Sequence, residues 1–112
     1  MGMNSKGKPR VSLVIPAYNE EDHILEVLER AICVMSEMGV DYEVILVNDG
    51  STDATGFKSF EYMRNNFHLK VISYRENKGK GYAVRAGFFS AVGDSVVSVS
   101  YTHLTLPTNR EV

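Results

Sequence analysis

The segment Glu43-Val-Ile-Leu-Val-Asn-Asp-Gly-Ser-Thr-Asp53 contains the strongest indication of the fold. Its run from Val44 to Val47 is apolar and mostly β-branched, without the polar alternation of a half-exposed strand, which is typical of a strand buried on both faces. The polar residues 48–53 then form a turn. A strand that leads through a polar turn into a helical segment is the unit from which parallel sheets are built.

The same unit precedes this stretch. Val11-Ser-Leu-Val-Ile15 predicts a first strand, which we expect Pro16 to end. Apolar residues at helical spacing predict a helix over 21–38, with Asn19 as its N-cap and Gly39 as its stop.

The unit is also repeated further along the chain. We expect a second helix with Ser51 as its cap, extending to about Asn65, with Phe57 and Phe60 on its inner side. A third strand over 69–74, a third helix over 79–92 with a face of small residues, and a fourth strand from 95 follow. Alternating strands and helices with short connections predict an α/β fold, a Rossmann-like parallel sheet with helices on both faces.

Composition fits one small folded domain. The chain has 112 residues, of which 44% are hydrophobic and 23% charged. Its net charge of -2 argues against a broad nucleic-acid interface. Cys33 is the single cysteine, so no internal disulfide can form, and we expect its thiol to be buried. We expect no signal peptide, and no apolar run approaches the ~20 residues that span a bilayer.

Three polar segments, 16–20, 48–53 and 76–81, follow the first three strands and should meet at one edge of the sheet, where α/β folds bind ligands. There the Asp49 carboxylate could accept the N3–H of uracil, or the N1–H and amino group of guanine. Tyr18 could stack on the base, and Glu20 could accept a hydrogen bond from a ribose hydroxyl. The alternative is that residues 48–53 only shape a turn and cap a helix.

Asn77-Lys-Gly-Lys-Gly81 places two lysines among glycines at a predicted helix start. Backbone N–H groups there favour an anion such as a diphosphate, although a solvated turn is the alternative. Neither common phosphate loop is present: no Walker sequence occurs, and Val84 stands where a dinucleotide fingerprint needs its third glycine. This argues against a dinucleotide-dependent oxidoreductase. The histidines show no metal-ligand spacing.

Four segments in this order resemble family 2 glycosyltransferases of the GT-A fold, in particular the polyprenyl-phosphate (dolichyl-phosphate) mannosyl- and glucosyltransferases. The segments are Val11-Ser-Leu-Val-Ile-Pro-Ala-Tyr-Asn-Glu20, Tyr42-Glu-Val-Ile-Leu-Val-Asn-Asp-Gly-Ser-Thr-Asp53, Asn77-Lys-Gly-Lys-Gly-Tyr-Ala-Val-Arg-Ala-Gly87 and Ala91-Val-Gly-Asp94. The resemblance covers residues 10–97 and implies the nucleotide-sugar-binding half of an incomplete GT-A domain. It also implies transfer of a hexose from GDP-mannose or UDP-glucose to a polyprenyl phosphate.

The resemblance also implies roles for particular residues. The nucleotide-sugar site would comprise Pro16, Ala17, Tyr18, Glu20, Val47, Asp49 and Lys80. The family usually has two aspartates before the glycine, and here Asn48 replaces the first. The complete enzyme would bind Mg²⁺ or Mn²⁺ through an Asp-x-Asp motif, but Ser100-Tyr-Thr102 stands at the expected place and offers no carboxylate. Residues that perform catalysis are not identified.

The ends of the chain depart from the family pattern. Residues 100–112 resemble a translated adapter sequence, so we expect a non-native tail over 98–112; a genuine but divergent C-terminus is the alternative. We expect residues 1–9 to be disordered. This chain alone should be inactive. We expect the parent protein in the cytoplasm, associated with the membrane surface if its acceptor is a lipid phosphate. The alternative function is a catalytically inactive nucleotide-binding α/β module.

Overall fold

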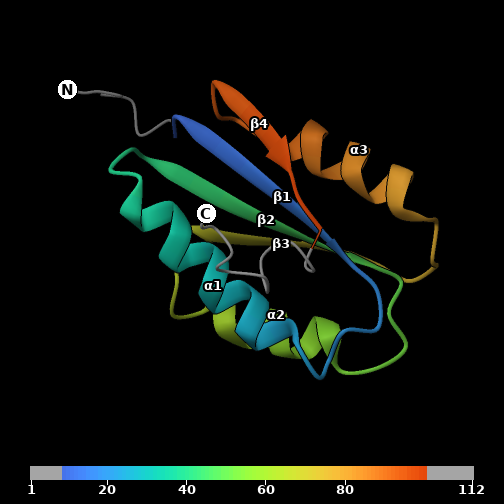
Figure 1. Cartoon of the computed structure of the whole chain (residues 1–112). Coiled ribbons are helices and arrows are strands. Elements are labelled where there is room, and N and C mark those ends of the chain that lie inside the picture. The colour runs from blue at the N-terminus through green and yellow to red at the C-terminus, as the bar shows by residue number, and fades with distance from the viewer. Residues whose placement is uncertain (1–8, 101–112) are drawn as a thin grey trace, which may run out of the picture.

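The computed structural model describes residues 9–100 and contains one parallel sheet. Its strands and helices are β1 (Val11–Ala17), α1 (Ile24–Glu37), β2 (Tyr42–Asp49), α2 (Thr55–Met63), β3 (Leu69–Tyr74), α3 (Lys80–Ser90) and β4 (Ser95–Ser98). The strand order is β3-β2-β1-β4. Helices α1 and α2 cover one face and α3 covers the other, so the expected α/β architecture with helices on both faces is confirmed (Figure 1).

Two hydrophobic clusters pack the two faces of the sheet. Because successive side chains of a strand point to opposite faces, Leu13 and Ile15 of β1 join the cluster beneath α1, whereas Val14 joins the cluster beneath α3. Helix α1 contributes Ile24, Val27, Leu28, Ala31 and Met35 to the first cluster. All eight residues of β2 are buried, as expected for a central strand covered on both faces.

Helix α3 lies close to the sheet through small residues, as the sequence predicts. Ala83 and Gly87 are its buried positions. A β-carbon on Gly87 would lie 2.3 Å from Cγ1 of Val14, so only glycine fits at this contact. Close packing of α3 fixes the place of the loop that precedes it, and this loop belongs to the site described below.

Pro16 does not end β1, which continues to Ala17. The Val14 carbonyl accepts the N–H of Val99 on the β4 side, and residues two apart in a strand turn their backbone groups the same way. The backbone nitrogen of Pro16 therefore faces β4, whose pairing with β1 ends at Val14. Because no β4 residue pairs with Pro16, the absence of its N–H removes no hydrogen bond from the sheet.

Helix α1 begins at Ile24 rather than at residue 21, and Asn19 is not its cap. Asn19 adopts a left-handed conformation with φ of 53°. Its Oδ1 accepts the backbone N–H of Thr52 at 2.8 Å, a partner from another loop. The cap prediction was wrong because this long-range partner replaces the local one.

Two burial predictions were also wrong. Helix α2 turns Phe57 and Phe60 outward, with exposed fractions of 69% and 41%, and buries Thr55 and Ser59 instead. Cys33 is exposed, with its Sγ 3.8 Å from a carboxylate oxygen of Glu37. In α2 the buried residues lie one or two positions from those expected, so the buried face is rotated. In α1 the expected Ile24, Leu28, Ala31 and Met35 are buried, and Cys33 lies off that face.

Within residues 9–100 no helix has the length and apolar content needed to cross a bilayer. Of the segments expected at the ends, residues 1–8 and 101–112 lie outside the described residues. Pro9 and residues 98–100 lie within them, and Ser98 is the last residue of β4.

Candidate functional site

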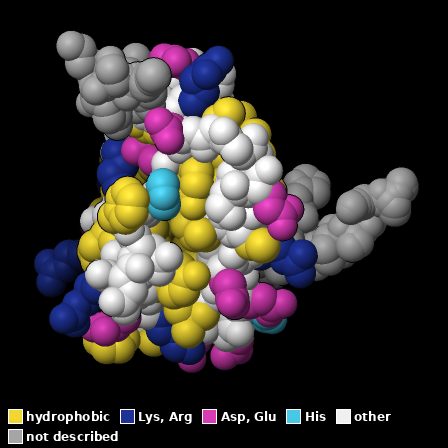
Figure 2. Space-filling model, turned by 90° about the vertical axis from the view of Figure 1, so that its left-hand side faces the viewer, with side chains coloured by type: hydrophobic (Ala, Val, Ile, Leu, Met, Phe, Trp, Pro, Cys, Tyr) yellow, Lys and Arg dark blue, Asp and Glu magenta, His cyan; other side chains and the backbone are white. Residues whose placement is uncertain are grey.

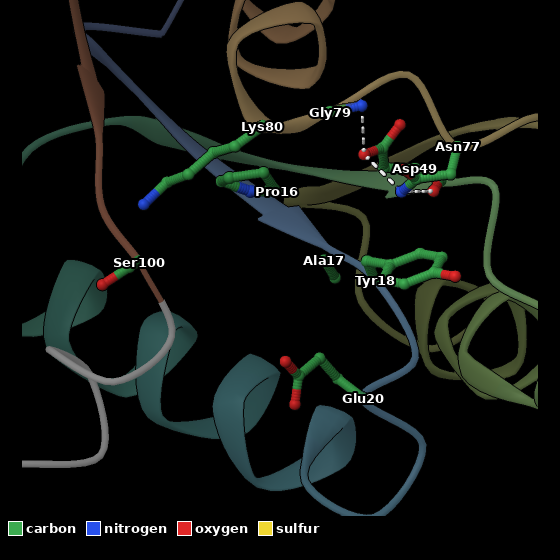
Figure 3. A pocket seen from close by; sticks show the side chains of 9 residues that line it. All are labelled: Pro16, Ala17, Tyr18, Glu20, Asp49, Asn77, Gly79, Lys80 and Ser100. Atoms are coloured by element: carbon green, nitrogen blue, oxygen red, sulfur yellow. Dashed lines mark hydrogen bonds between the residues drawn. The ribbon is translucent and has the colours of Figure 1, made fainter.

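A cavity of about 560 Å³ opens at the carboxyl edge of the sheet (Figure 3). Its walls come from the end of β1 and the loop after it, the end of β2, the loop before α3 with the first residue of α3, and the segment after β4. The lining residues are Pro16, Ala17, Tyr18, Glu20, Asp49, Asn77, Gly79, Lys80 and Ser100. Six of the seven residues that the sequence assigned to a nucleotide-sugar site lie here. Val47 does not, because its side chain is fully buried in the cluster beneath α3.

Asp49 is the most enclosed polar group of this cavity, with an exposed fraction of 3%. Asn77 Nδ2 donates to its Oδ2 at 3.0 Å, and the Gly79 N–H donates to the same oxygen at 3.0 Å. The Lys78 N–H donates to Oδ1 at 2.8 Å. A buried carboxylate needs such donors to offset the loss of water. Asp49 therefore fastens the end of β2 to the loop before α3.

These contacts correct one expectation about the glycine-rich loop. Its N–H groups do hold an anion, as its composition suggested, but at Lys78 and Gly79 that anion is the carboxylate of Asp49. These two N–H groups are thus already engaged. A diphosphate at this loop would have to rely on the α3 N-terminus and on Lys80, whose side chain reaches from α3 toward Ser100 (Figure 3).

The remaining cavity walls differ in chemistry. Tyr18 has an exposed fraction of 45% and places its ring below Asp49, whereas Glu20 points its carboxylate into the cavity from the opposite wall (Figure 3). Lys80 contributes a cation at the far end. The cavity therefore offers, in order, an acceptor beside an aromatic ring, a second carboxylate and a positive charge.

Hydrogen bonds between two loops hold Tyr18 and Glu20 in place. The Asn19 N–H donates to Ser51 Oγ at 2.9 Å, and the Glu20 N–H donates to Thr55 Oγ1 at 2.8 Å. Asp53 accepts from the backbone N–H and the hydroxyl of Thr55. Burial would raise the pKa of Asp53, but these hydrogen bonds outweigh it and lower that pKa. Ser51 is not the cap expected for α2, because the helix begins at Thr55 after Ala54 and the Ser51 hydroxyl accepts the Asn19 N–H instead. Asp53 accepts the N–H of the first helical residue, and Asp49 lines the cavity.

Tyr74 lies at the end of β3, beside Asp49 and edge-to-face with Tyr82. Its hydroxyl is buried and makes no hydrogen bond within the described part of the chain. Burial first, and then the neighbouring Asp49 carboxylate, raise the pKa of Tyr74 because both disfavour the phenolate. Tyr74 is therefore a protonated, uncharged neighbour of Asp49.

The residues of this cavity do not form a metal site. Ser100, where the family pattern expects the first carboxylate, lines the cavity with a hydroxyl. Between residues 9 and 100 no three histidine, cysteine or acidic side chains gather in a way that could hold a cation. Asp49 already accepts three hydrogen bonds, so it is a poor candidate ligand. The described residues thus do not fit the Mg²⁺ or Mn²⁺ expected for a complete enzyme.

The amino edge of the sheet carries a second cavity of about 630 Å³, and hydrophobic side chains form a band on this side of the molecule (Figure 2). Here Glu43 accepts hydrogen bonds from Ser12 at 2.5 Å and from the Val92 N–H at 2.8 Å, and pairs with Lys70 at 2.9 Å. These contacts connect the turn after α3 to the sheet, so the buried Glu43 carboxylate has a structural role.

Three lining residues were not among the predicted site residues: Asn77, Gly79 and Ser100. Asn77 and Gly79 belong to the glycine-rich segment that the sequence singled out, so their position after β3 could have identified them. The role of Asn77 depends on its contact with Asp49, 28 residues earlier, and no local pattern indicates such a contact.

Residues 12–105 match the family described as Glycosyl transferase family 2. An uncharacterized glycosyltransferase from Synechocystis is 36% identical over 89 residues, which cover 80% of this chain and 28% of the relative. A Pyrobaculum calidifontis mannosyltransferase, solved with GDP-Man and Mn²⁺, aligns with a TM-score of 0.70 and 27% identity over 84% of this chain and 28% of its own. TarS of S. aureus (residues 1–349), solved with UDP-GlcNAc, aligns with a TM-score of 0.67 and 31% identity over 82% of this chain and 26% of its own.

The chain thus spans about a quarter of the length of these relatives. The family match, in contrast, extends over most of the chain and includes the three loops that surround the cavity. Its parallel sheet with helices on both faces agrees with the GT-A glycosyltransferases that it resembles in structure. The chain belongs to glycosyl transferase family 2.

Proposed function

We propose that the chain binds the nucleotide of a nucleotide-sugar donor, and that its parent protein transfers the sugar. The observation that carries this proposal is the meeting of Asp49, Tyr18 and Lys80 at one cavity, although they come from three different segments. Asp49 would accept a base N–H, the Tyr18 ring would stack on the base, and Lys80 would attract the diphosphate. Pro16, Ala17 and Glu20 would complete the nucleoside pocket, and Glu20 would accept a hydrogen bond from a ribose hydroxyl.

The solved relatives support this donor class. One was solved with GDP-Man and another with UDP-GlcNAc, so related structures bind hexose nucleotides with either base. A hexose donor such as GDP-mannose or UDP-glucose is therefore our proposal for the parent protein. Transfer to a polyprenyl phosphate rests on the resemblance of the four sequence segments. With such an acceptor the parent would work at a membrane surface facing the cytoplasm.

The metal of the parent protein belongs to the same proposal. The mannosyltransferase relative was solved with Mn²⁺, which supports a divalent cation, Mg²⁺ or Mn²⁺, as cofactor. A hard cation would neutralise the diphosphate leaving group. Because Ser100 has a hydroxyl where a carboxylate is expected, we propose that this chain binds nucleotide without transferring sugar. We also propose that residues 10–97 are the native domain half and that 98–112 are a non-native tail.

Binding of UDP and GDP to the chain, followed by isothermal titration calorimetry, tests the proposal. Replacing Tyr18 by Ala removes the stacking ring, and base–aromatic stacking contributes about 1–3 kcal/mol, so affinity for the better nucleotide should fall about tenfold. Tyr18→Phe keeps the ring and is the matched control. The side chain is 45% exposed, so neither change should disturb the core.

Asp49→Ala should also weaken binding at least tenfold because it removes the acceptor for the base. Glu37→Ala, at the far end of α1, controls for the loss of a carboxylate outside the cavity. If the chain bound neither nucleotide, or bound the better one equally well in the Tyr18→Ala and Asp49→Ala variants, the proposed pocket would be refuted.

A further inference from the structure

The Asp49 carboxylate has limited capacity for hydrogen bonds with a ligand. A carboxylate offers about four acceptor positions, two on each oxygen. Both positions of Oδ2 are used, one by the side-chain amide of Asn77 and one by the Gly79 N–H. One position of Oδ1 is used by the Lys78 N–H. The Tyr74 hydroxyl makes no hydrogen bond to any group among residues 9–100, so a single position on Oδ1 remains.

The donors that occupy Asp49 are held in place by the backbone. Asn77 Nδ2 donates to the Asp49 carbonyl oxygen at 3.0 Å as well as to the carboxylate. Gly50, the next residue, lies so close to this loop that an added β-carbon would be 2.2 Å from the Asn77 backbone nitrogen. The two loops are therefore in direct backbone contact. A ligand that needed a second acceptor from Asp49 would have to displace a donor from this packed arrangement.

The bases of common nucleotide sugars differ in the number of donors that they present. Uracil and thymine have one imide N–H between two carbonyl groups. Guanine has two adjacent donors, N1–H and the 2-amino group, which ordinarily pair with both oxygens of one carboxylate. Cytosine presents no ring N–H at the corresponding position. Asp49 is 3% exposed, so little water reaches its carboxylate, and a base donor that lies beside it without an acceptor would be poorly solvated.

We propose that Asn77 makes this cavity selective for a base with a single imide N–H, uracil or thymine, over guanine. The inference rests on the proposed function, because it assigns the base of the nucleotide that the cavity binds. Asn77 acts as a specificity-determining residue through Asp49: by filling the second position of Oδ2, it prevents the carboxylate from accepting two donors of one base. Stacking on Tyr18 works in the opposite direction, because a purine covers more of the ring.

Calorimetric titration of the chain with UDP, dTDP and GDP tests this directly, since the shared diphosphate cancels in the comparison. UDP or dTDP should bind about tenfold more tightly than GDP, the effect expected for one unpaired buried donor. The UDP and dTDP titrations show which of the two bases is preferred. Binding of GDP as tight as, or tighter than, that of both pyrimidine nucleotides overturns the inference and leaves the proposed pocket intact. Binding of none of the three refutes the pocket itself.

A variant of Asn77 separates its role in selectivity from a role in stability. Asn77→Ala opens the second position of Oδ2, so the ratio of the UDP and GDP affinities should narrow to less than about threefold, even if both affinities fall. Glu76→Ala changes the neighbouring residue, whose exposed carboxylate pairs only weakly with Lys78 at 3.5 Å, and should keep the ratio of the unmodified chain. An unchanged ratio in Asn77→Ala would contradict the role given to Asn77.

Discussion

Gly50 and Asn77 lie in backbone contact, although they belong to loops that follow different strands. A β-carbon on Gly50 would be 2.2 Å from the backbone nitrogen of Asn77 and 2.3 Å from the carbonyl carbon of Glu76. Gly50 also has a φ of 68°, a conformation that side chains rarely adopt. This contact brings the two loops together at the point where Asp49 accepts its hydrogen bonds, so the cavity wall depends on a residue without a side chain.

Replacing Gly50 by alanine should therefore destabilise the fold by at least about 2 kcal/mol, since it adds a steric clash to an unfavourable φ. Gly39→Ala is the matched control because Gly39 has a φ of 75° but open space around it. It should cost only about 1 kcal/mol. Urea denaturation followed by circular dichroism measures both. Equal losses for the two variants would mean that the loops do not press on each other.

Helix α3 offers a second pair of glycines for comparison. Gly87→Ala places a methyl group 2.3 Å from Cγ1 of Val14 and should destabilise the protein by about 1–3 kcal/mol through overpacking. Gly81 has no neighbour within 4 Å, and alanine there should stabilise by about 0.5 kcal/mol through helix propensity and a less flexible unfolded chain. Gly87→Ala should cost less in a Val14→Ala background than in the unmodified chain, because the clash with Cγ1 of Val14 is then absent. If both alanine variants changed stability alike, α3 would not lie close to the sheet.

Glu43 should make stability depend on pH. Burial acts to raise the pKa of Glu43, but hydrogen bonds from Ser12 and the Val92 N–H and the charge of Lys70 outweigh it and hold that pKa below its ordinary 4.5. The stabilisation is therefore complete above about pH 4.5 and is lost as pH falls through the lowered pKa of the folded state. Thermal melts between pH 3 and 7 should show this loss.

Glu43→Gln should lower the free energy of unfolding by about 2 kcal/mol at pH 7 and remove part of the dependence below pH 4.5. Glu61→Gln is the control, since Glu61 pairs with Arg64 at the surface at 3.5 Å. Surface pairs of this kind contribute about 0–1 kcal/mol. A Glu43→Gln protein as stable as the unmodified chain at pH 7 would show that the buried carboxylate contributes nothing.

Tyr74→Phe should increase stability by about 1 kcal/mol, because it removes a buried hydroxyl that makes no hydrogen bond in the described structure. The ring and its edge-to-face contact with Tyr82 would remain. Chemical denaturation provides the measurement. A loss of stability would indicate instead that the hydroxyl donates to Asp49 in solution.

The strands could be predicted from sequence because their burial is continuous. Val44 to Val47 are covered on both faces, and a parallel sheet flanked by two helix layers covers a strand in this way. The edge at which the loops meet follows from the same topology, so most of the residues that line the cavity could be predicted from the sequence. Lys80 and Asp49, 31 positions apart, were placed together by this argument alone.

Contacts between loops could not be predicted in this way. The sequence predicts Asn19 as a helix cap, but in the structure its side chain accepts the Thr52 N–H. The sequence predicts an anion site at Lys78 and Gly79, but in the structure the Asp49 carboxylate occupies their N–H groups. In both cases local chemistry identified a polar group correctly, but the partner lies 29 to 33 residues away and is chosen by the fold.

We propose that a nucleotide binds at the carboxyl edge of the sheet, between Tyr18 and Asp49. Titration of UDP into ¹⁵N-labelled chain, followed by amide chemical shifts in NMR spectra, tests it most directly. We expect the largest shifts at Tyr18, Asp49 and Lys80, and unchanged signals from Tyr42 and His68 at the opposite cavity. Shifts concentrated on Tyr42 and His68, or an unchanged spectrum with both UDP and GDP, would contradict it.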